Sequence, residues 1–506
     1  MDVIKTLLHS GWEYAFAPSD AVQTPDDCAG LTFRPAAVPG VNLTDLQAAG
    51  LVEPDTSATY EDSFAPYAQM DFIYRCRFDG SEVADRLHLF LCCDGLDTIC
   101  TLYLNGQRLG ETENAHLGYR FDVVGRVLPG ENELLLLFRS PVVEAEKRAD
   151  AYAAAFGRAL PAPHGGTFMY IRKPAYSYFW DWGPKIPVSG IYKNIYLLAY
   201  DRAEIEEYHV RYQVREGAVT GTVALLAGGD AAGAQARLRL AGRTFQASVG
   251  DDGRASVAFA IPEAQLWYPN GEGEPFLYDL QLVLEAEGRP LDERRQRIGF
   301  RTIELVREPR QDDRGTRFLF RVNGRDVFIR GYNWIPVDNA LPRGYGRLYE
   351  GNLDLARRGN VNMLRIWGGG YYETDEFYRL CDERGIMVWQ DGAFACALYP
   401  DDDPAFLELV RQELSYNIRR LRNATSLALW CGENENHWGF EEWWYDRRAF
   451  PFFGGAHIYD ELFPALVREL DPDRPYWNGS PYSEEPGVRA NDAFHGDTHF
   501  WDLHSN

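Results

Sequence analysis

The sequence has few cysteines and no long hydrophobic run. Its eight cysteines are scattered over 506 residues and include the adjacent pair Cys92 and Cys93, so their spacing does not indicate a zinc site. His495 and His499 lack a third ligand at a suitable spacing. We expect reduced structural thiols, no metal and no cofactor. No stretch reaches the roughly 18 apolar residues of a membrane span, and the first residues lack a signal-peptide core, so we expect a cytoplasmic protein without a membrane partner.

Basic side chains are scarce relative to acidic ones. Lys and Arg number 51 against 75 Asp and Glu, which gives a formal net charge of −24. Because nucleic acids require basic surfaces, we expect no nucleic-acid partner. Aromatic residues, in contrast, make up 14% of the chain. Most belong to cores, but several tryptophans stand in expected loops or at strand ends, where an indole face suits a sugar ring: Trp180, Trp182, Trp367, Trp438, Trp443 and Trp444.

Three regions of the chain differ in their pattern. Residues 1–198 alternate apolar and polar residues between turn signals such as Asn105-Gly106, with one helical stretch at 140–157. This pattern predicts an antiparallel jelly-roll sandwich. Residues 199–305 hold about six short strands, which is the rhythm of an immunoglobulin-like sandwich.

From residue 306 onward, expected strands alternate with expected helices. This alternation is typical of parallel βα units, and polar residues follow each strand as they do at the catalytic face of a closed (β/α)₈ barrel. Residues 306–506 are therefore expected to form a TIM barrel. About six strands precede Asn506, so we expect the barrel to be incomplete and to stop before strand seven.

Carboxylates, amides and indoles follow these expected strands. Sugar hydrolysis requires two carboxyl groups flanking a glycosidic bond, and one must stay protonated near neutral pH, which an indole-lined site favours. The candidates are Asn333 and Trp334 after strand one, Arg365 and Trp367 after strand two, Asp391 after strand three, Glu433, Asn434 and Glu435 after strand four, and Asp497 and His499 after strand six.

Structural explanations compete with catalytic ones at these positions. A Glu at a strand end is most often a solvated loop residue, but the buried strand, Asn434 and the nearby tryptophans favour a role for Glu435. Glu433 is interpreted as a structural or rim carboxylate. Asp391 could simply form a buried ion pair with Arg365.

Several stretches together resemble the β-mannosidases of glycoside hydrolase family 2, and the resemblance covers essentially the whole chain. The catalytic barrel of that family is resembled by RGYNWIPVD (330–338), by residues 362–400, by LWCGENEN (429–436) and by GDTHFWD (496–502). Its sugar-binding jelly roll is resembled by residues 38–46, 95–110 and 172–192, and its sandwich domain by residues 266–280 and 299–305.

The resemblance implies a retaining, exo-acting enzyme that releases terminal non-reducing β-D-mannose from oligosaccharides or glycoconjugates. It implies that Glu435 is the general acid/base and that Asn434 bonds the sugar 2-hydroxyl. Asp181, beside Trp180, would reach the sugar hydroxyls from the first region. Trp367 and Trp443 would be aromatic residues of the site. The remaining candidate substrate-binding residues are Arg365, Asn333, Asp391 and His499.

The sequence departs from the family pattern at two points. Glu433 stands where the family usually has Asn. The family nucleophile is a Glu in a SEFG-like motif at strand seven, and this sequence contains no such motif, so we expect no nucleophile in this chain. Alternatives are an exo-β-glucosaminidase, an endo-β-mannosidase or a non-catalytic carbohydrate-binding fragment. The sequence leaves the oligomeric state open.

Overall fold

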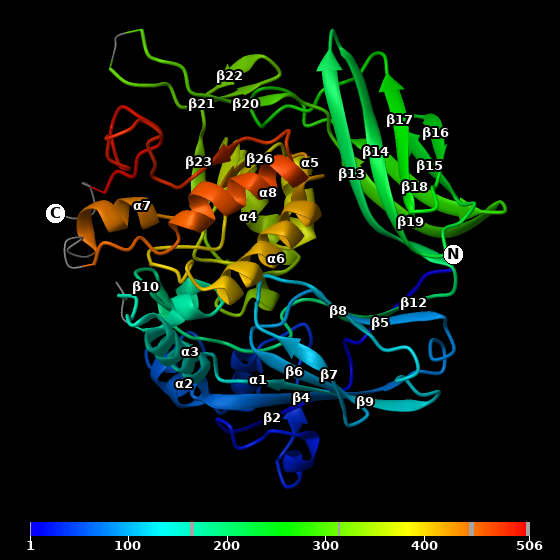
Figure 1. Ribbon diagram of the computed structural model, residues 1–506, viewed down its shortest axis with the longest axis vertical. Coiled ribbons are helices and arrows are strands. Elements are labelled where there is room, and N and C mark those ends of the chain that lie inside the picture. Colours follow the sequence, from blue (N-terminus) through cyan, green and yellow to red (C-terminus); the bar gives the residue numbers. More distant parts are fainter. Residues whose placement is uncertain (1, 162–165, 312–313, 445–449, 502–506) are drawn as a thin grey trace.

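The computed structural model describes residues 2–161, 166–311, 314–444 and 450–501. Figure 1 shows three regions packed together: a blue and cyan β-rich region at the bottom, a green β-rich region at the upper right, and a yellow to orange region of mixed helices and strands at the upper left.

The first region is a β-sandwich of two antiparallel sheets with an added hairpin, which confirms the sandwich expected here. The larger sheet comprises β2 (Trp12–Pro18), β3 (Arg34–Pro35), β4 (Met70–Asp79), β6 (Cys100–Leu104), β7 (Gln107–Thr112) and β9 (Glu131–Phe138), in the order β3-β2-β4-β9-β6-β7. The smaller sheet comprises β1 (Ile4–Leu7), β5 (His88–Cys93), β8 (Tyr119–Asp122) and β12 (Ile195–Tyr200), in the order β1-β12-β5-β8. The hairpin pairs β10 (Tyr178–Trp180) with β11 (Gly183–Lys185).

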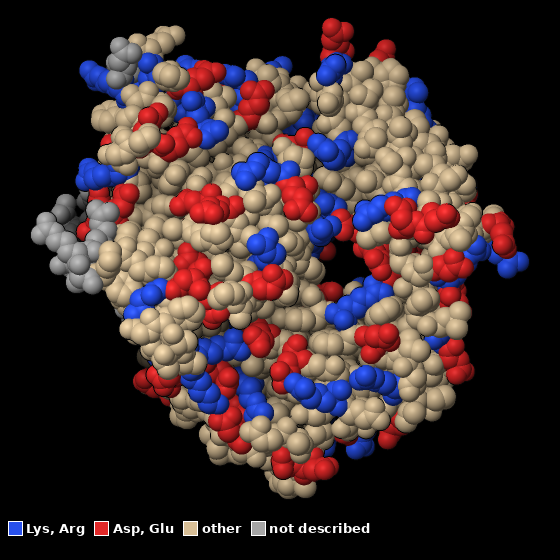
Figure 2. All heavy atoms as spheres, in the orientation of Figure 1, with Lys and Arg blue, Asp and Glu red and all other residues tan. Residues whose placement is uncertain are grey.

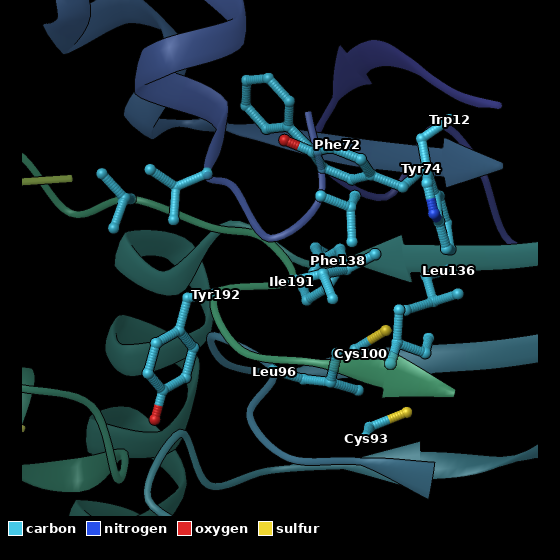
Figure 3. Packing of buried hydrophobic residues seen from close by; sticks show 14 of the residues in the cluster. Trp12, Phe72, Tyr74, Cys93, Leu96, Cys100, Leu136, Phe138, Ile191 and Tyr192 are labelled. Carbon is cyan, nitrogen blue, oxygen red and sulfur yellow. The ribbon is translucent and has the colours of Figure 1, made fainter. Parts of the chain in front are cut away.

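Strand periodicity accounts for the core of this sandwich. Successive side chains of a strand point to opposite faces, so alternate residues of β4 and β9, such as Tyr74 and Leu136, turn toward the smaller sheet. Figure 3 shows these side chains packed with Trp12 and with Cys93 of β5 between the sheets. Burying this apolar surface supplies about 25 cal/mol per Å² and holds the two sheets together.

Three helices accompany this sandwich: α1 (Asn42–Ala48), α2 (Tyr60–Ala68) and α3 (Pro141–Phe156). The sequence predicts α3, and its ends explain why it forms there. Ser140 Oγ accepts a hydrogen bond from the Val143 amide at 3.2 Å, and Gly157 adopts the left-handed conformation that ends the helix. The short helices α1 and α2 are not expected from the sequence, because neither is long enough to show a clear helical period.

The second region is a sandwich of seven strands, the number typical of an immunoglobulin-like domain. One sheet comprises β13 (Ala203–Arg215), β14 (Ala218–Gly229) and β17 (Arg254–Ile261), in that order. The other comprises β15 (Gln235–Leu240), β16 (Arg243–Ser248), β18 (Tyr278–Ala286) and β19 (Arg289–Ile298), in the order β16-β15-β18-β19. Residues from both sheets, including Val223 and Leu282, form one core, which confirms the expected sandwich.

The third region begins with an antiparallel sheet of β20 (Ile303–Val306), β21 (Leu319–Val322) and β22 (Arg325–Val327). A parallel sheet follows, in which the strands lie side by side in chain order: β23 (Gly331–Trp334), β24 (Met363–Ile366), β25 (Met387–Asp391), β26 (Leu427–Cys431) and β27 (Tyr476–Trp477).

Helices connect these parallel strands as the sequence predicts. They are α4 (Arg347–Arg358), α5 (Asp375–Arg384), α6 (Pro404–Leu421) and α8 (Phe463–Leu470), with the short α7 (Asn436–Trp438) directly after β26. Asp403 caps α6 by accepting a hydrogen bond from the Ala405 amide at 2.9 Å.

The expectation of a sixth parallel strand near residue 497 is wrong for the described residues. This stretch forms no strand and makes only an isolated bridge between Asp497 and Tyr482. Its polar side chains bond nearby backbone instead: Asn491 accepts from the His499 amide at 2.9 Å, and Asp492 accepts from the Phe494 amide at 2.9 Å. Such local bonds compete with strand pairing. Asp502, the last residue of the GDTHFWD motif, lies outside the described residues.

The charged surface and the cysteines can both be located in the structure. Figure 2 shows acidic and basic side chains interspersed over the face it displays. All eight cysteines lie in the described part of the chain as free thiols, seven of them buried. Within that part, no helix is both long and apolar enough to cross a membrane.

Candidate active site

The parallel sheet brings the candidate residues together at one edge. Asn333 lies in β23, Arg365 in β24 and Asp391 at the end of β25, and residues 433–435 follow β26 directly. Parallel strands all end at the same edge of a sheet, so these residues become neighbours although they lie far apart in the sequence. Residues 433–435 follow their strand as expected, but the expectation that Asn333 and Arg365 come after their strands is wrong, because both lie inside them.

Glu435 occupies the turn from β26 into α7 and is only 8% exposed. Its φ of 62° is left-handed, which is uncommon for a residue with a side chain and recurs at functional sites. Its Oε1 lies 2.6 Å from His499 Nδ1 and accepts a hydrogen bond from Trp501 Nε1 at 3.2 Å. Its Oε2 accepts one from Cys396 Sγ at 3.5 Å.

The pKa of Glu435 is lowered, contrary to the expectation that an indole-lined site would raise it. Burial raises this pKa, but the hydrogen bond and charge of His499, together with the hydrogen bonds from Trp501 and Cys396, outweigh burial. The sequence places His499 after a different strand and gives no indication of so short a contact.

Arg365 links the ends of four strands. Its guanidinium donates to both Asp391 oxygens, at 3.2 and 2.7 Å, and this buried ion pair confirms the structural alternative for Asp391. It also donates to the side-chain oxygens of Asn434 at 3.0 Å and Asn333 at 3.2 Å. Burial raises the pKa of Asp391 to about 6, while the charge and hydrogen bonds of Arg365 act in the opposite direction. The amide of Asn434 is thereby fixed directly beside Glu435.

Glu433 is structural and buried, so the rim alternative is wrong. Its Oε1 lies 2.7 Å from His437 Nδ1, and its Oε2 accepts from the Asn436 amide. The side chain is fully buried, and the pKa of His437 rises to about 9 because the attraction of Asp460 and Glu433 outweighs its burial. Glu433 therefore holds the loop that carries Glu435.

The β10–β11 hairpin of the first region reaches the parallel sheet. The ring of Trp180 lies 4.6 Å from that of Trp367, edge to face, and the ring of Trp182 lies 5.6 Å from it. Asp181 stands at the exposed tip of the hairpin between these two tryptophans. The structure thus brings Trp180 and Trp367 into contact, with Asp181 next to Trp180 in the sequence; a contact of Asp181 with sugar hydroxyls stays a prediction.

Trp443 lies in the turn after α7 and is 44% exposed. Its ring contacts Trp438 at 5.6 Å, and Trp438 contacts His499 at 6.4 Å. The rings of His499, Trp438 and Trp443 therefore form a row that ends at the exposed Trp443. This row and the two hairpin tryptophans can stack on sugar rings.

Comparison with known proteins identifies related domains, sequences and structures. Residues 12–193 match the family model described as glycosyl hydrolase 2 galactose-binding domain-like, and residues 203–301 match that of glycosyl hydrolases family 2. β-Mannosidase B of Aspergillus oryzae is 33% identical over 98% of this chain, and the β-mannosidase of Capra hircus is 32% identical over 84% of it. A crystal structure of β-D-mannosidase from Dictyoglomus thermophilum covers 99% of the chain with a TM-score of 0.90 and 35% identity. The chain belongs to glycosyl hydrolase family 2.

The chain covers only part of the length of each of these relatives. The chain spans 59% of the Aspergillus protein, 51% of the Capra protein and 60% of the Dictyoglomus chain.

Three residues that contact this family 2 site are missing from the sequence-based candidates. Cys396 accepts a hydrogen bond from Asn434 Nδ2 at 3.4 Å and donates to Glu435, Trp501 also donates to Glu435, and the Ser480 carbonyl accepts from the Glu435 amide at 2.9 Å. Ser480 follows β27, so the rule that polar residues follow each strand could have found it. Cys396 carries no comparable signal.

The described residues contain no group of three or more His, Cys, Asp or Glu side chains placed to hold a metal ion. The candidate acid–base residues are held by protein donors such as Arg365, His499 and Trp501.

Proposed function

We propose that this chain carries the acid/base part of a retaining, exo-acting β-mannosidase that releases terminal β-D-mannose from oligosaccharides or glycoconjugates. The observation that carries the proposal is Glu435, buried at the carboxyl end of β26 beside an asparagine that Arg365 orients. The similarity to proteins named β-mannosidases supports mannose as the sugar.

In this proposal Glu435 protonates the leaving oxygen and later activates water. Asn434 presents its amide to the sugar 2-hydroxyl, and Arg365 holds that amide in place with Asp391 and Asn333. The sugar ring stacks among Trp180, Trp367 and Trp443, and Asp181 bonds hydroxyls at the closed end of the site. His499 contacts Glu435 at the edge of the substrate.

The proposal also assigns an architecture. Residues 1–198 form a jelly-roll unit, residues 199–305 an immunoglobulin-like unit, and residues 306–506 part of a TIM barrel. The five parallel strands in chain order, each joined to the next through a helix, support the barrel assignment.

The retaining mechanism needs a second carboxylate about 5–5.5 Å from the acid/base, across the anomeric carbon. The three carboxylates named near Glu435 serve other partners. Asp391 pairs with Arg365, Glu433 with His437, and Asp497 accepts from Ser480 Oγ at 2.6 Å and Trp477 Nε1 at 2.8 Å. We therefore place the nucleophile outside the described residues.

Substrate selectivity tests the proposal. The complete protein should hydrolyse an aryl β-mannoside, and Glu435→Gln should reduce kcat/KM by about 100- to 10,000-fold, because the amide cannot donate an acid proton. Glu442→Gln is a matched control, since Glu442 lies in the segment after α7 and bonds Trp438 and Arg489 rather than Glu435. A preference for the corresponding β-glucosaminide, or full activity of Glu435→Gln, would contradict the proposal.

A further inference from the structure

A chain of hydrogen bonds leads from the buried Glu435 to a second, half-buried carboxylate, Asp497. Glu435 Oε1 lies 2.6 Å from His499 Nδ1, and His499 Nε2 lies 2.9 Å from Ser480 Oγ. Ser480 Oγ in turn lies 2.6 Å from Asp497 Oδ2. Imidazole and hydroxyl therefore connect two carboxyl groups in a continuous line.

The direction of these hydrogen bonds can be assigned from the far end. Asp497 Oδ1 accepts from Trp477 Nε1 at 2.8 Å and from the Tyr482 amide at 3.1 Å, and its Oδ2 faces Ser480. Ser480 Oγ donates to Asp497 Oδ2, and this hydrogen bond uses the single proton of the hydroxyl. Ser480 Oγ can then only accept from His499, and Nε2 of that ring must carry a hydrogen.

Because Nε2 of His499 carries a hydrogen, only the protonation of Nδ1 can vary. The close contact between His499 Nδ1 and Glu435 Oε1 then holds one proton, which either atom can carry. If it sits on Nδ1, the pair is an imidazolium beside a carboxylate. If it sits on Oε1, the pair is a neutral imidazole beside a carboxylic acid. The two states differ only in the place of this proton.

The backbone also holds His499 in this position. Asn491 Oδ1 accepts from the His499 amide at 2.9 Å, and Asn491 Nδ2 donates to the His499 carbonyl at 3.0 Å. The ring faces Glu435 and Ser480, with Trp438 at 6.4 Å.

We propose that Asp497 and Ser480 are positioning residues that fix the tautomer of His499, so that Glu435 and His499 share one proton as a catalytic dyad. In the first step the shared proton passes from Glu435 to the leaving oxygen, which leaves a carboxylate and a neutral imidazole. In the second step Glu435 takes a proton from the attacking water and the pair is restored. Until the first step, the short contact between Glu435 Oε1 and His499 Nδ1 keeps this proton within the pair.

The inference rests on the proposed acid/base role of Glu435, but its test requires no turnover. Nitrogen NMR of the 506-residue chain with labelled histidine reports which ring nitrogen is protonated, and His499→Gln assigns the signal. We expect hydrogen on Nε2 of His499 at every pH at which the chain is folded. A neutral ring with a bare Nε2 would overturn the proposal.

Asp497→Asn is the decisive variant. Trp477 Nε1 and the Tyr482 amide are both donors, so the single oxygen of the new asparagine must face them. Its NH₂ group then points toward Ser480 Oγ and donates to it. The Ser480 hydroxyl must in turn donate to His499 Nε2. The hydrogen of the neutral ring should move to Nδ1. An unchanged His499 signal would overturn the proposal.

The matched control is Asp492→Asn, which alters a carboxylate 2.8 Å from His495 Nδ1 in the same segment and should leave His499 unchanged. If Asp497→Asn does not fold, Ser480→Ala replaces it. Without the hydroxyl both tautomers should be populated, and retention of a single Nε2-protonated form would count against the relay.

Discussion

At the scale of single residues, the buried pair of His437 and Glu433 makes stability depend on pH. The pKa of His437 rises to about 9 in the folded protein, above roughly 6.5 for an unfolded histidine. A raised pKa stabilises the fold fully below pH 6.5, and the contribution, up to about 3 kcal/mol, is lost as pH rises through 9. We expect the melting temperature to fall between pH 6.5 and 9, and to fall less in His437→Gln. His457→Gln, which removes an exposed histidine 3.2 Å from Glu461, is the control, and an equal slope in all three proteins would refute the assignment.

At the scale of elements, the β10–β11 hairpin connects the first sandwich to the candidate site. Trp180 and Trp182 pack on Trp367, which places Asp181 at the edge of the parallel sheet. In Asp181→Ala we expect kcat/KM for terminal β-mannosides to fall about 10- to 100-fold, because a charged hydrogen bond to the substrate contributes about 1.5–3 kcal/mol. Lys185→Ala, at the other end of the hairpin, should be neutral. Equal rates on internal mannan linkages would argue against a site closed by this hairpin.

The elements also show what could be predicted from the sequence. Long periodic stretches such as α3 and α6 are predictable, because their pattern and capping residues agree. The expected strand near Asp497 does not form, because local hydrogen bonds of Asn491 and Asp492 replace strand pairing there. Apolar and polar alternation cannot report such bonds.

At the scale of the whole molecule, the order of the parallel strands explains why most of the site residues could be predicted from the sequence. Once parallel strands are inferred, Asn333, Arg365, Asp391 and Glu435 must gather at one edge. The contact of His499 with Glu435 depends on how an irregular segment folds back over that edge, and no sequence period encodes it. The lowered pKa of Glu435 follows from that contact and was unpredictable for the same reason.

The dependence of rate on leaving group tests the role of Glu435 most directly. In the complete protein carrying Glu435→Ala, hydrolysis of β-mannosides with poor leaving groups should fall far more than hydrolysis of activated aryl β-mannosides. Only the poor leaving groups need a proton from the acid, which contributes about 100- to 10,000-fold to the rate. A steep dependence of kcat/KM on leaving-group pKa in the variant, against a shallow one in the unaltered protein, is the result that we predict. An equal loss across the whole series would contradict the assignment and give Glu435 a structural role.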